Sequence, residues 1–178
     1  MADLGLTGSQ TVGPYLHMGL LRELIGPEIV PRDQPGAIVI RGVLLDGAGA
    51  PVPDGLVETW QADPQGRYDA PEFSGLARAG TVAGGAFELV TVKPGRVEHP
   101  DGRLQAPHLA VGVLARGLLK RLVTRLYFPD EATANDEDPV LGLLSAEERA
   151  TLLAVPDDGF LRFDIRLQGA GQTTFFAL

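Results

Sequence analysis

The stretch FLRFDIRLQ, residues 160–168, alternates apolar and polar side chains along its length. Its apolar members after Phe160 recur every second residue and are Leu161, Phe163, Ile165 and Leu167. Successive side chains of a β-strand point to opposite faces of a sheet, so this period places one face against a core and the other in a polar environment. The stretch therefore predicts a strand with one buried face.

Further stretches have strand character, because branched apolar residues are concentrated in them and Gly, Pro or Asp bounds them. They are residues 37–45, 56–62, 86–92, 109–115 and 122–128. Turn sequences rich in Gly and Pro separate these stretches. Strands at this spacing are typical of a β-sandwich, so the sequence predicts an all-β fold.

Only one helix is clearly indicated. Ser145 can cap it, and Glu148 three residues later completes a capping box. Residues 4–35 are rich in Gly and Pro, and residues 129–139 are acidic and poor in apolar side chains. We expect both of these segments to be irregular.

Length and composition limit the class of protein. A chain of 178 residues fits one domain, so we expect a single domain over 1–178, with an arm over 1–35 and a sandwich over 36–178. The 15 basic and 23 acidic residues give a net charge of -8, which disfavours binding to nucleic acid or an anionic membrane. The absence of cysteine excludes disulfides, Cys-ligated metals and thiol nucleophiles. Without a signal-peptide pattern or a long apolar run, we expect a cytoplasmic protein.

Few side chains could carry chemistry unaided. The three histidines are far apart along the chain, and no phosphate-binding, zinc-protease or serine-hydrolase motif is present. A lone histidine at a strand entrance, such as His108, is usually a hydrogen-bonded structural residue. We expect Trp60 in the core and Tyr68 half buried. Arg125, inside an alternating strand, would ordinarily be solvated or salt-bridged.

A series of short motifs resembles the intradiol dioxygenases. In chain order they are Ser9-Gln10-Thr11-Val12-Gly13-Pro14-Tyr15, Val57-Glu58-Thr59-Trp60-Gln61-Ala62, Gly66-Arg67-Tyr68, Thr91-Val92-Lys93-Pro94-Gly95, Ala106-Pro107-His108, Thr124-Arg125-Leu126-Tyr127-Phe128 and Arg162-Phe163-Asp164-Ile165. Each motif is weak alone, but the series keeps the family's order over nearly the whole chain. The resemblance implies the β-sandwich of that family, with a long irregular N-terminal segment and one short peripheral helix.

The same resemblance bears on iron. A catalytic chain of this family binds Fe³⁺ through two Tyr and two His, and Tyr68 and His108 match one position of each kind. At the other two positions stand Val97 and Ala110, whose side chains offer a metal no lone pair. Gln105 stands where the catalytic chain has an Arg. The resemblance thus implies four vestigial metal positions, with no bound metal and no catalytic residue in this chain.

These losses are similar to those of the iron-free α subunits found in hetero-oligomeric members of the family. There the active site lies at the interface with an iron-bearing β subunit, so Fe³⁺ is expected in the partner and the arm over 1–35 is expected to pack on it. The segments that match the shared substrate pocket contain Thr11, Gly13, Pro14, Tyr15 and Arg125. The implied reaction is cleavage of protocatechuate (3,4-dihydroxybenzoate) by O₂ to 3-carboxy-cis,cis-muconate. An arginine suits the ring carboxylate, because its donors form a planar fork.

Two alternatives stay open on the sequence. One is a stand-alone intradiol dioxygenase acting on a catechol with a non-standard iron site, in which Glu98 or His99 supplies a ligand; the iron content of the isolated chain separates it from an α subunit. The other is a non-enzymatic transthyretin-like β-sandwich module, because turns like Asp46 to Pro53 occur in many sandwiches. Co-purification with an iron-bearing chain of similar fold decides against such a module.

Overall fold

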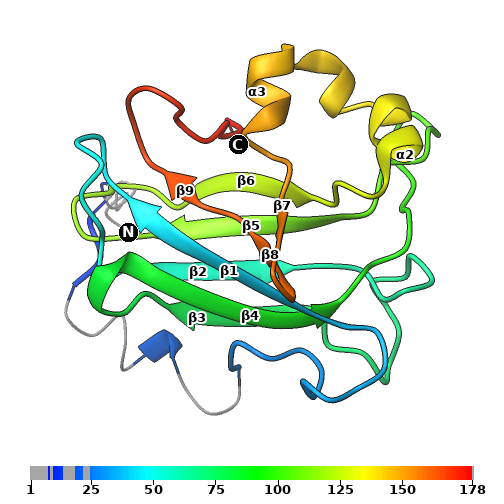
Figure 1. Cartoon of the computed structure of the whole chain (residues 1–178), viewed down its shortest axis with the longest axis horizontal. Coiled ribbons are helices and arrows are strands. Elements are labelled where there is room, and N and C mark those ends of the chain that lie inside the picture. Colours follow the sequence, from blue (N-terminus) through cyan, green and yellow to red (C-terminus); the bar gives the residue numbers. More distant parts are fainter. Residues whose placement is uncertain (1–7, 9, 14–18, 22–24, 178) are drawn as a thin grey trace, which may run out of the picture.

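Two β-sheets make up most of the molecule (Figure 1), in a computed structural model that describes residues 8, 10–13, 19–21 and 25–177. The first sheet has the strand order β4-β1-β8-β7, with β9 paired to β1, and the second has the order β3-β2-β5-β6. The strands are β1 (Ala37–Leu45), β2 (Leu56–Trp60), β3 (Leu76–Gly80), β4 (Ala86–Val92), β5 (His108–Leu114), β6 (Leu122–Tyr127), β7 (Val155–Asp157), β8 (Phe160–Arg162) and β9 (Ile165–Arg166).

The main core lies between the two sheets. Ile40 and Leu44 of β1 and Leu89 of β4 pack there against Leu109 and Val111 of β5. These residues alternate along their strands with outward-facing side chains, as the period of a half-buried strand requires. The predicted all-β sandwich is therefore confirmed.

The strand predictions differ in accuracy. Those for β1 and β4 are confirmed at both ends, and those for β2, β5 and β6 are within two residues. The sequence missed β3, whose residues Leu-Ala-Arg-Ala-Gly have low β-propensity. It forms because all five of its residues pair with β2. The sequence also missed the three-residue β7.

The stretch 160–168 forms two short strands, β8 and β9, instead of one. Both run parallel to β1. Between them the Asp164 carboxylate accepts a hydrogen bond from the Val43 N–H at 3.0 Å, in the place of a backbone partner. The predicted alternation still holds, because Phe163 and Ile165 are buried in the core and Asp164 is exposed.

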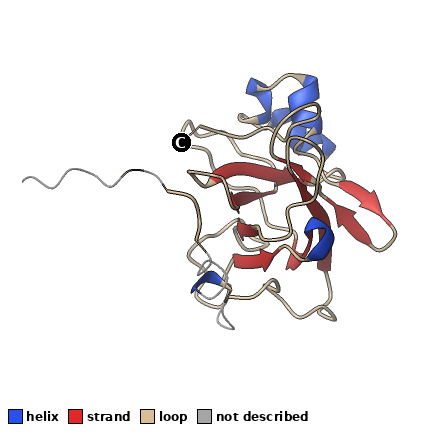
Figure 2. Ribbon diagram, turned by 90° about the vertical axis from the view of Figure 1, so that its left-hand side faces the viewer, coloured by secondary structure: helices blue, strands red, loops and turns tan. Residues whose placement is uncertain are grey.

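The helical residues gather mainly at one end of the sandwich (Figures 1 and 2). They form α2 (Ala132–Glu137), α3 (Ala146–Ala150) and the 3-10 turns η1 (Ala83–Gly85) and η2 (Leu141–Leu143). The capping box of Ser145 and Glu148 on α3 is confirmed. The prediction that residues 129–139 are irregular, and that the chain has one short helix, is wrong because α2 lies in that segment. Tertiary contacts select α2, since Asn135 donates to the Phe128 carbonyl at 2.8 Å and Ala134 packs against Tyr127.

Part of the expected arm lies on this chain's own sandwich. The Gly26 carbonyl accepts from Arg78 N–H of β3, the Pro27 carbonyl accepts from Val90 N–H of β4, and Ile29 N–H donates to the Val90 carbonyl. The segment thereby covers sheet edges that would otherwise be open for pairing. None of the helices formed by the described residues combines the length and the apolar character that a membrane span requires.

Candidate functional site

Some of the predicted site residues meet on the outer face of the second sheet. Trp60, Ala110 and Arg125 stand side by side on β2, β5 and β6, and His108 faces Tyr127 one step along. Side chains alternate along each strand, so these residues point away from the core that their neighbours on β5 and β6 enter. The strand register alone therefore places Arg125, which was predicted to line the partner's substrate pocket, beside the vestigial metal positions His108 and Ala110.

Arg125 is held by two hydrogen-bond partners within this chain. Its Nη1 donates to the Gln105 Oε1 at 2.8 Å and to the Tyr127 hydroxyl at 3.0 Å. The side chain is partly buried. Among the described residues no carboxylate forms an ion pair with it, so of the two ordinary expectations the salt-bridged one does not hold.

Asp138, which follows α2, organises the buried side of this region. Its carboxylate accepts backbone N–H groups from Ala106, Val140 and Leu141 at 2.7 to 2.9 Å. It also accepts the Tyr127 hydroxyl proton at 3.3 Å, so that this hydroxyl can accept from Arg125 with its oxygen. Asp138 was not predictable from the sequence, because it lies in an acidic segment with no local motif.

His108 is a buried structural residue, as predicted, with 5% of its surface exposed. Its Nδ1 lies 2.8 Å from the Ala106 carbonyl oxygen, so Nδ1 carries the proton and Nε2 the lone pair. Burial and, as a smaller cause, the positive charge of Arg125 lower the pKa of His108 to about 4. The imidazole is therefore neutral at neutral pH.

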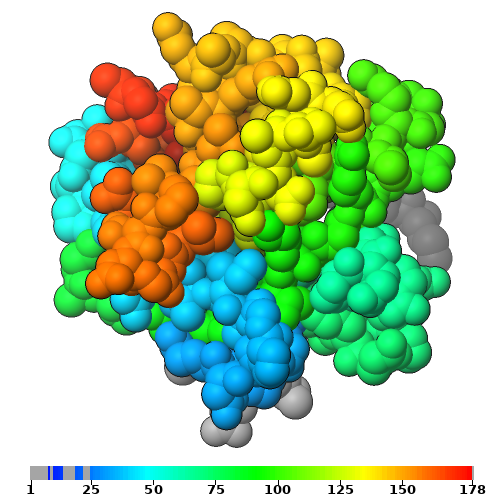
Figure 3. All heavy atoms as spheres, turned by 45° about the vertical axis from the view of Figure 1, so that its right-hand side comes forward, coloured from blue at the N-terminus to red at the C-terminus, as the bar shows by residue number. Residues whose placement is uncertain are grey.

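Trp60 lies outside the core, contrary to the sequence prediction. It is 42% exposed and stacks on Tyr68, which is 45% exposed, with ring centroids 6.0 Å apart and planes 9° from parallel. As the last residue of β2 it points outward, and the loop that follows returns to place Tyr68 over it. That loop forms a separate lobe on one face of the molecule (teal in Figure 3). Burial raises the pKa of Tyr68, while the nearby charge of Arg125 lowers it.

Glycines fix the loops that carry Tyr68 and Val97. A Cβ on Gly66, which has φ of 80°, would meet the Arg96 carbonyl oxygen at 2.2 Å, and one on Gly95 would meet the Gly66 nitrogen at 2.5 Å. Only glycine permits this approach of two backbones. The loops therefore keep a fixed geometry, and the buried Val97 is held at its position.

The donor set does not fit ferric iron. Tyr68 and His108 each offer one donor atom, whereas Val97 and Ala110 offer none. The described residues also contain no group of three or more His, Cys, Asp or Glu placed to hold a metal ion. Two donors, one of them a phenol whose pKa burial raises, are too few to bind Fe³⁺ tightly.

The N-terminal candidates lie at a different place on the same sheet. Thr11 Oγ1 accepts a hydrogen bond from the Gly117 N–H at 2.8 Å, in the turn between β5 and β6. Gly13 is exposed, whereas Pro14 and Tyr15 lie outside the described residues. The turn is about 10 Å along β6 from Arg125, at three residues of about 3.3 Å each. The structure therefore does not bring Thr11 and Arg125 together.

A different arginine stands beside Thr11. Arg116 precedes Gly117 in the turn, its side chain is 74% exposed, and its Nε lies 2.9 Å from the Asp54 carboxylate. Arg116 was not among the residues predicted from the sequence. The sequence signal that could have identified Arg116 is an Ala-Arg-Gly turn between two predicted strands. This turn indicates a site only once Thr11 is known to contact it.

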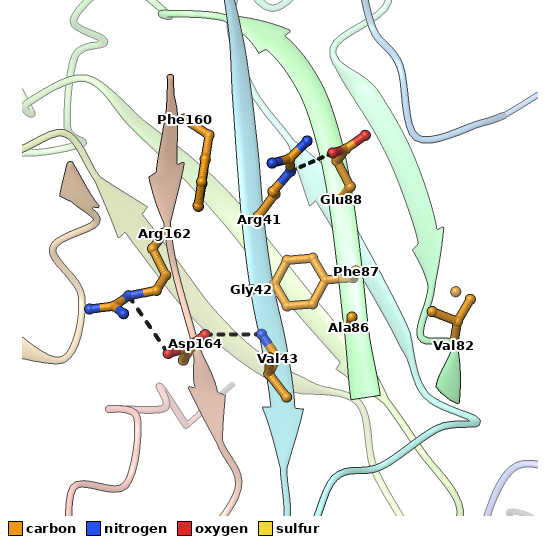
Figure 4. Close-up of a pocket in the computed structure, with 11 residues that line it drawn as sticks. Arg41, Gly42, Val43, Val82, Ala86, Phe87, Glu88, Phe160, Arg162 and Asp164 are labelled. Carbon is orange, nitrogen blue, oxygen red and sulfur yellow. Dashed lines mark hydrogen bonds and ion pairs between the residues drawn. The ribbon is translucent and has the colours of Figure 1, made fainter. Parts of the chain in front are cut away.

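A groove of ≈ 490 Å³ lies elsewhere, over the outer face of the first sheet (Figure 4). Its charged side chains pair with one another, Arg41 with Glu88 at 2.7 Å and Arg162 with Asp164 at 4.0 Å. It is the opposite face of the sandwich from Arg125. We place no chemistry in this groove, because its charges are already compensated and no family motif places a catalytic group in it.

Comparisons with known proteins give the same family as the series of sequence motifs. Residues 27–169 match the family described as Dioxygenase. The chain is 41% identical over 199 residues to the protocatechuate 3,4-dioxygenase alpha chain of Burkholderia cepacia, covering 99% of each chain. It is 44% identical over 191 residues to the alpha chain of Pseudomonas putida, covering 96% of this chain and 95% of that one.

Two further similarities are more distant. The beta chain of the Burkholderia cepacia enzyme is 37% identical over 107 residues, which cover 53% of this chain and 45% of that chain. The dioxygenase domain of a dioxygenase carbohydrate-binding protein fusion from Streptomyces sp. SirexAA-E is 28% identical, with a TM-score of 0.59 over 82% of this chain and 89% of that chain.

The family match covers most of the sandwich, and the alpha-chain relatives are similar over almost the full length of the chain. The remaining metal-position residues, Tyr68 and His108, lie at the same outer face, as the motif series requires. This chain belongs to the intradiol dioxygenases, a family of iron enzymes.

Proposed function

We propose that this chain is the non-iron-binding α subunit of a protocatechuate 3,4-dioxygenase. One observation carries the proposal: Val97 and Ala110 supply no donor at two of the four metal positions. The chain showing this loss is similar over nearly its full length to two protocatechuate 3,4-dioxygenase alpha chains. The cleavage of protocatechuate to 3-carboxy-cis,cis-muconate is then an activity of the assembled enzyme.

The proposed partner is the β subunit of that enzyme, which holds the Fe³⁺. The similarity of this chain to a beta chain supports an assembly of two related sandwiches. The iron of the partner supplies the chemistry on the catechol and O₂. We propose hetero-oligomers of α–β pairs in the cytoplasm, each active site lying at the interface of the pair, with the arm over 1–35 reaching the partner.

The proposed task of this chain is to shape the partner's substrate pocket. The N-terminal segment of Thr11, Gly13, Pro14 and Tyr15 would form part of its wall, and a guanidinium would hold the substrate's ring carboxylate. The sequence motifs indicate Arg125 as the residue whose guanidinium holds the ring carboxylate. The structure adds Arg116 as a competing candidate, because it stands in the turn that Thr11 contacts.

Iron content tests the proposal directly. The chain purified alone should be colourless, iron-poor and inactive, and the chain co-expressed with an iron-bearing β subunit should yield a coloured complex that cleaves protocatechuate. A coloured, iron-loaded and active chain without a partner would instead establish the stand-alone dioxygenase. A chain that binds no such partner would overturn the proposal in favour of a non-enzymatic module.

A further inference from the structure

The guanidinium of Arg125 has one side in use and one edge open. Nη1 donates its hydrogens to Gln105 and Tyr127. The hydrogens of Nε and Nη2 on the neighbouring edge have no acceptor among the described residues. Two parallel N–H groups on one edge of a guanidinium match the two oxygens of a carboxylate.

Buried neighbours fix the direction of this open edge. Gln105 is 6% exposed, and its amide donates to the Glu98 carbonyl at 3.3 Å while its oxygen accepts from Arg125. Tyr127 is fully buried and is oriented by Asp138. A ligand of Arg125 would therefore meet a preorganised group, which reduces the entropy lost on binding.

The local charge favours an anion. On the same face of the sheet, Arg78 and Arg121 both pair with Glu58, at 2.7 and 3.1 Å. Arg125 has no carboxylate partner in the described part of the chain. The carboxylate of Asp138, which shares the Tyr127 hydroxyl with Arg125, already accepts three backbone N–H groups and that hydroxyl.

The register places a short side chain between an aromatic residue and the arginine. Trp60, Ala110 and Arg125 form one row across three strands, in which a single methyl group stands between two long side chains. Adjacent strands are about 4.8 Å apart, so the two outer residues start roughly 10 Å from each other. The half-exposed Trp60, backed by Tyr68, offers an aromatic face on one side of this row.

We propose that the row of Trp60, Ala110 and Arg125 binds a small aromatic carboxylate, which the chain holds without transforming it. The carboxylate takes the open edge of Arg125, and the ring lies over Ala110 towards Trp60. This site is additional to the partner's catalytic pocket. It also excludes Arg125 from that pocket, because both roles would need the same edge of the guanidinium.

Counting bound ligands in the assembled α–β complex tests this site. The probe is 4-hydroxybenzoate, an aromatic carboxylate that lacks the second hydroxyl of a catechol and is therefore not cleaved. Equilibrium dialysis should give two molecules per pair for the wild type and one for Arg125→Gln. The control Arg121→Gln should keep two, because Arg121 is already paired with Glu58. The uncharged 4-hydroxybenzyl alcohol should not bind at the additional site.

Other outcomes separate the hypotheses. One molecule per wild-type pair, or two molecules per Arg125→Gln pair, overturns the additional site and leaves the proposed function intact. One molecule per wild-type pair together with a loss of kcat/KM in Arg125→Gln assigns Arg125 to the partner's pocket. If the chain has no partner and no turnover, the proposed function fails. The additional site is then still supported by one molecule bound per wild-type chain and none per Arg125→Gln chain.

Discussion

Arg125 and Arg116 differ in what their guanidinium groups contact, and this difference predicts different kinetics. Arg125 donates to Gln105 and Tyr127, whereas Arg116, in the turn that Thr11 contacts, forms an exposed ion pair with Asp54. We expect Arg116→Ala in the α–β complex to lower kcat/KM for protocatechuate, since a charged hydrogen bond to the ring carboxylate contributes roughly 1.5 to 3 kcal/mol, or about 10- to 150-fold. Steady-state kinetics at constant iron content measure it.

The paired variant decides between the two arginines. Arg125→Ala should then leave kcat/KM nearly unchanged, with the iron content of the complex equal to that of the wild type. The reverse result, a loss confined to Arg125→Ala, would restore Arg125 to the partner's pocket as the sequence motif suggests. Wild-type kinetics in both variants would remove both arginines from it.

His108 makes the stability of the chain depend on pH. Its pKa is lowered to about 4 by burial and by Arg125, whereas an unfolded histidine titrates near 6.5. Between about pH 6.5 and pH 4 the unfolded state binds more protons, so the free energy of unfolding falls as the pH drops through this window. The neutral His108 makes its full contribution to the free energy of unfolding above about pH 6.5. Near pH 4 that free energy has fallen by about 3 kcal/mol on its account.

Urea denaturation at several pH values checks this. In His108→Gln the decline between about pH 6.5 and 4 should be shallower than in the wild type by the amount that His108 contributes. An equal slope in His108→Gln and the wild type would refute the assignment.

Single residues were predictable from sequence only where a local rule governs them. The structural role of His108 follows from its position at a strand entrance. The exposure of Trp60 does not, because it depends on Tyr68 returning over it from a loop eight residues later. The contacts of Arg125 likewise depend on Gln105 and Tyr127, which only the sheet register and the preceding loop bring together.

Among the elements, the junction of α2 with the loop before β5 depends on Asp138. Replacing it with Ala leaves three backbone N–H groups without their acceptor, those of Ala106, Val140 and Leu141. We expect Asp138→Ala to lower the free energy of unfolding by about 3 kcal/mol or more, as several buried donors lose their partners. Urea denaturation of the chain measures the change.

Asp136 provides the matched control for that substitution. It lies two residues earlier in the same acidic segment but is exposed. Asp136→Ala should change the free energy of unfolding by less than about 0.5 kcal/mol. Similar losses in both variants would mean that the charge of the segment matters and the buried carboxylate does not.

Element prediction succeeded where side-chain period and turn residues agree, as in β1 and β4. It failed for β3, whose Ala and Gly residues carry no strand signal and which pairs only because β2 is beside it. It also failed for α2, where contacts of Ala134 and Asn135 with the strand β6 and its end select a helix that composition does not favour.

At the scale of the whole molecule, the sandwich and the N-terminal segment are separable. The earliest described residue in the core clusters is Ile29. We expect deletion of residues 1–13 to leave the free energy of unfolding within about 0.5 kcal/mol of the wild type, while lowering kcat/KM of the α–β complex. Thr11→Val, which removes the acceptor of the Gly117 N–H, should lower kcat/KM less than the deletion.

The two measurements on the deletion variant answer different questions. Urea denaturation reports on the sandwich, and kinetics report on the partner's pocket. Unchanged kinetics would remove the segment from that pocket. A large loss of stability would show instead that residues 1–13 belong to the core.

The exposed stack of Trp60 on Tyr68 also gives this chain an optical reporter. Trp60 is the single tryptophan of the sequence, so all indole fluorescence of the isolated chain arises in the row that contains Ala110 and Arg125. Water contact at its exposed face sets a red-shifted emission, and a ring or a partner surface covering that face would shift the emission to the blue. Binding at the row of Trp60, Ala110 and Arg125 can thus be followed in the unlabelled chain by emission wavelength alone.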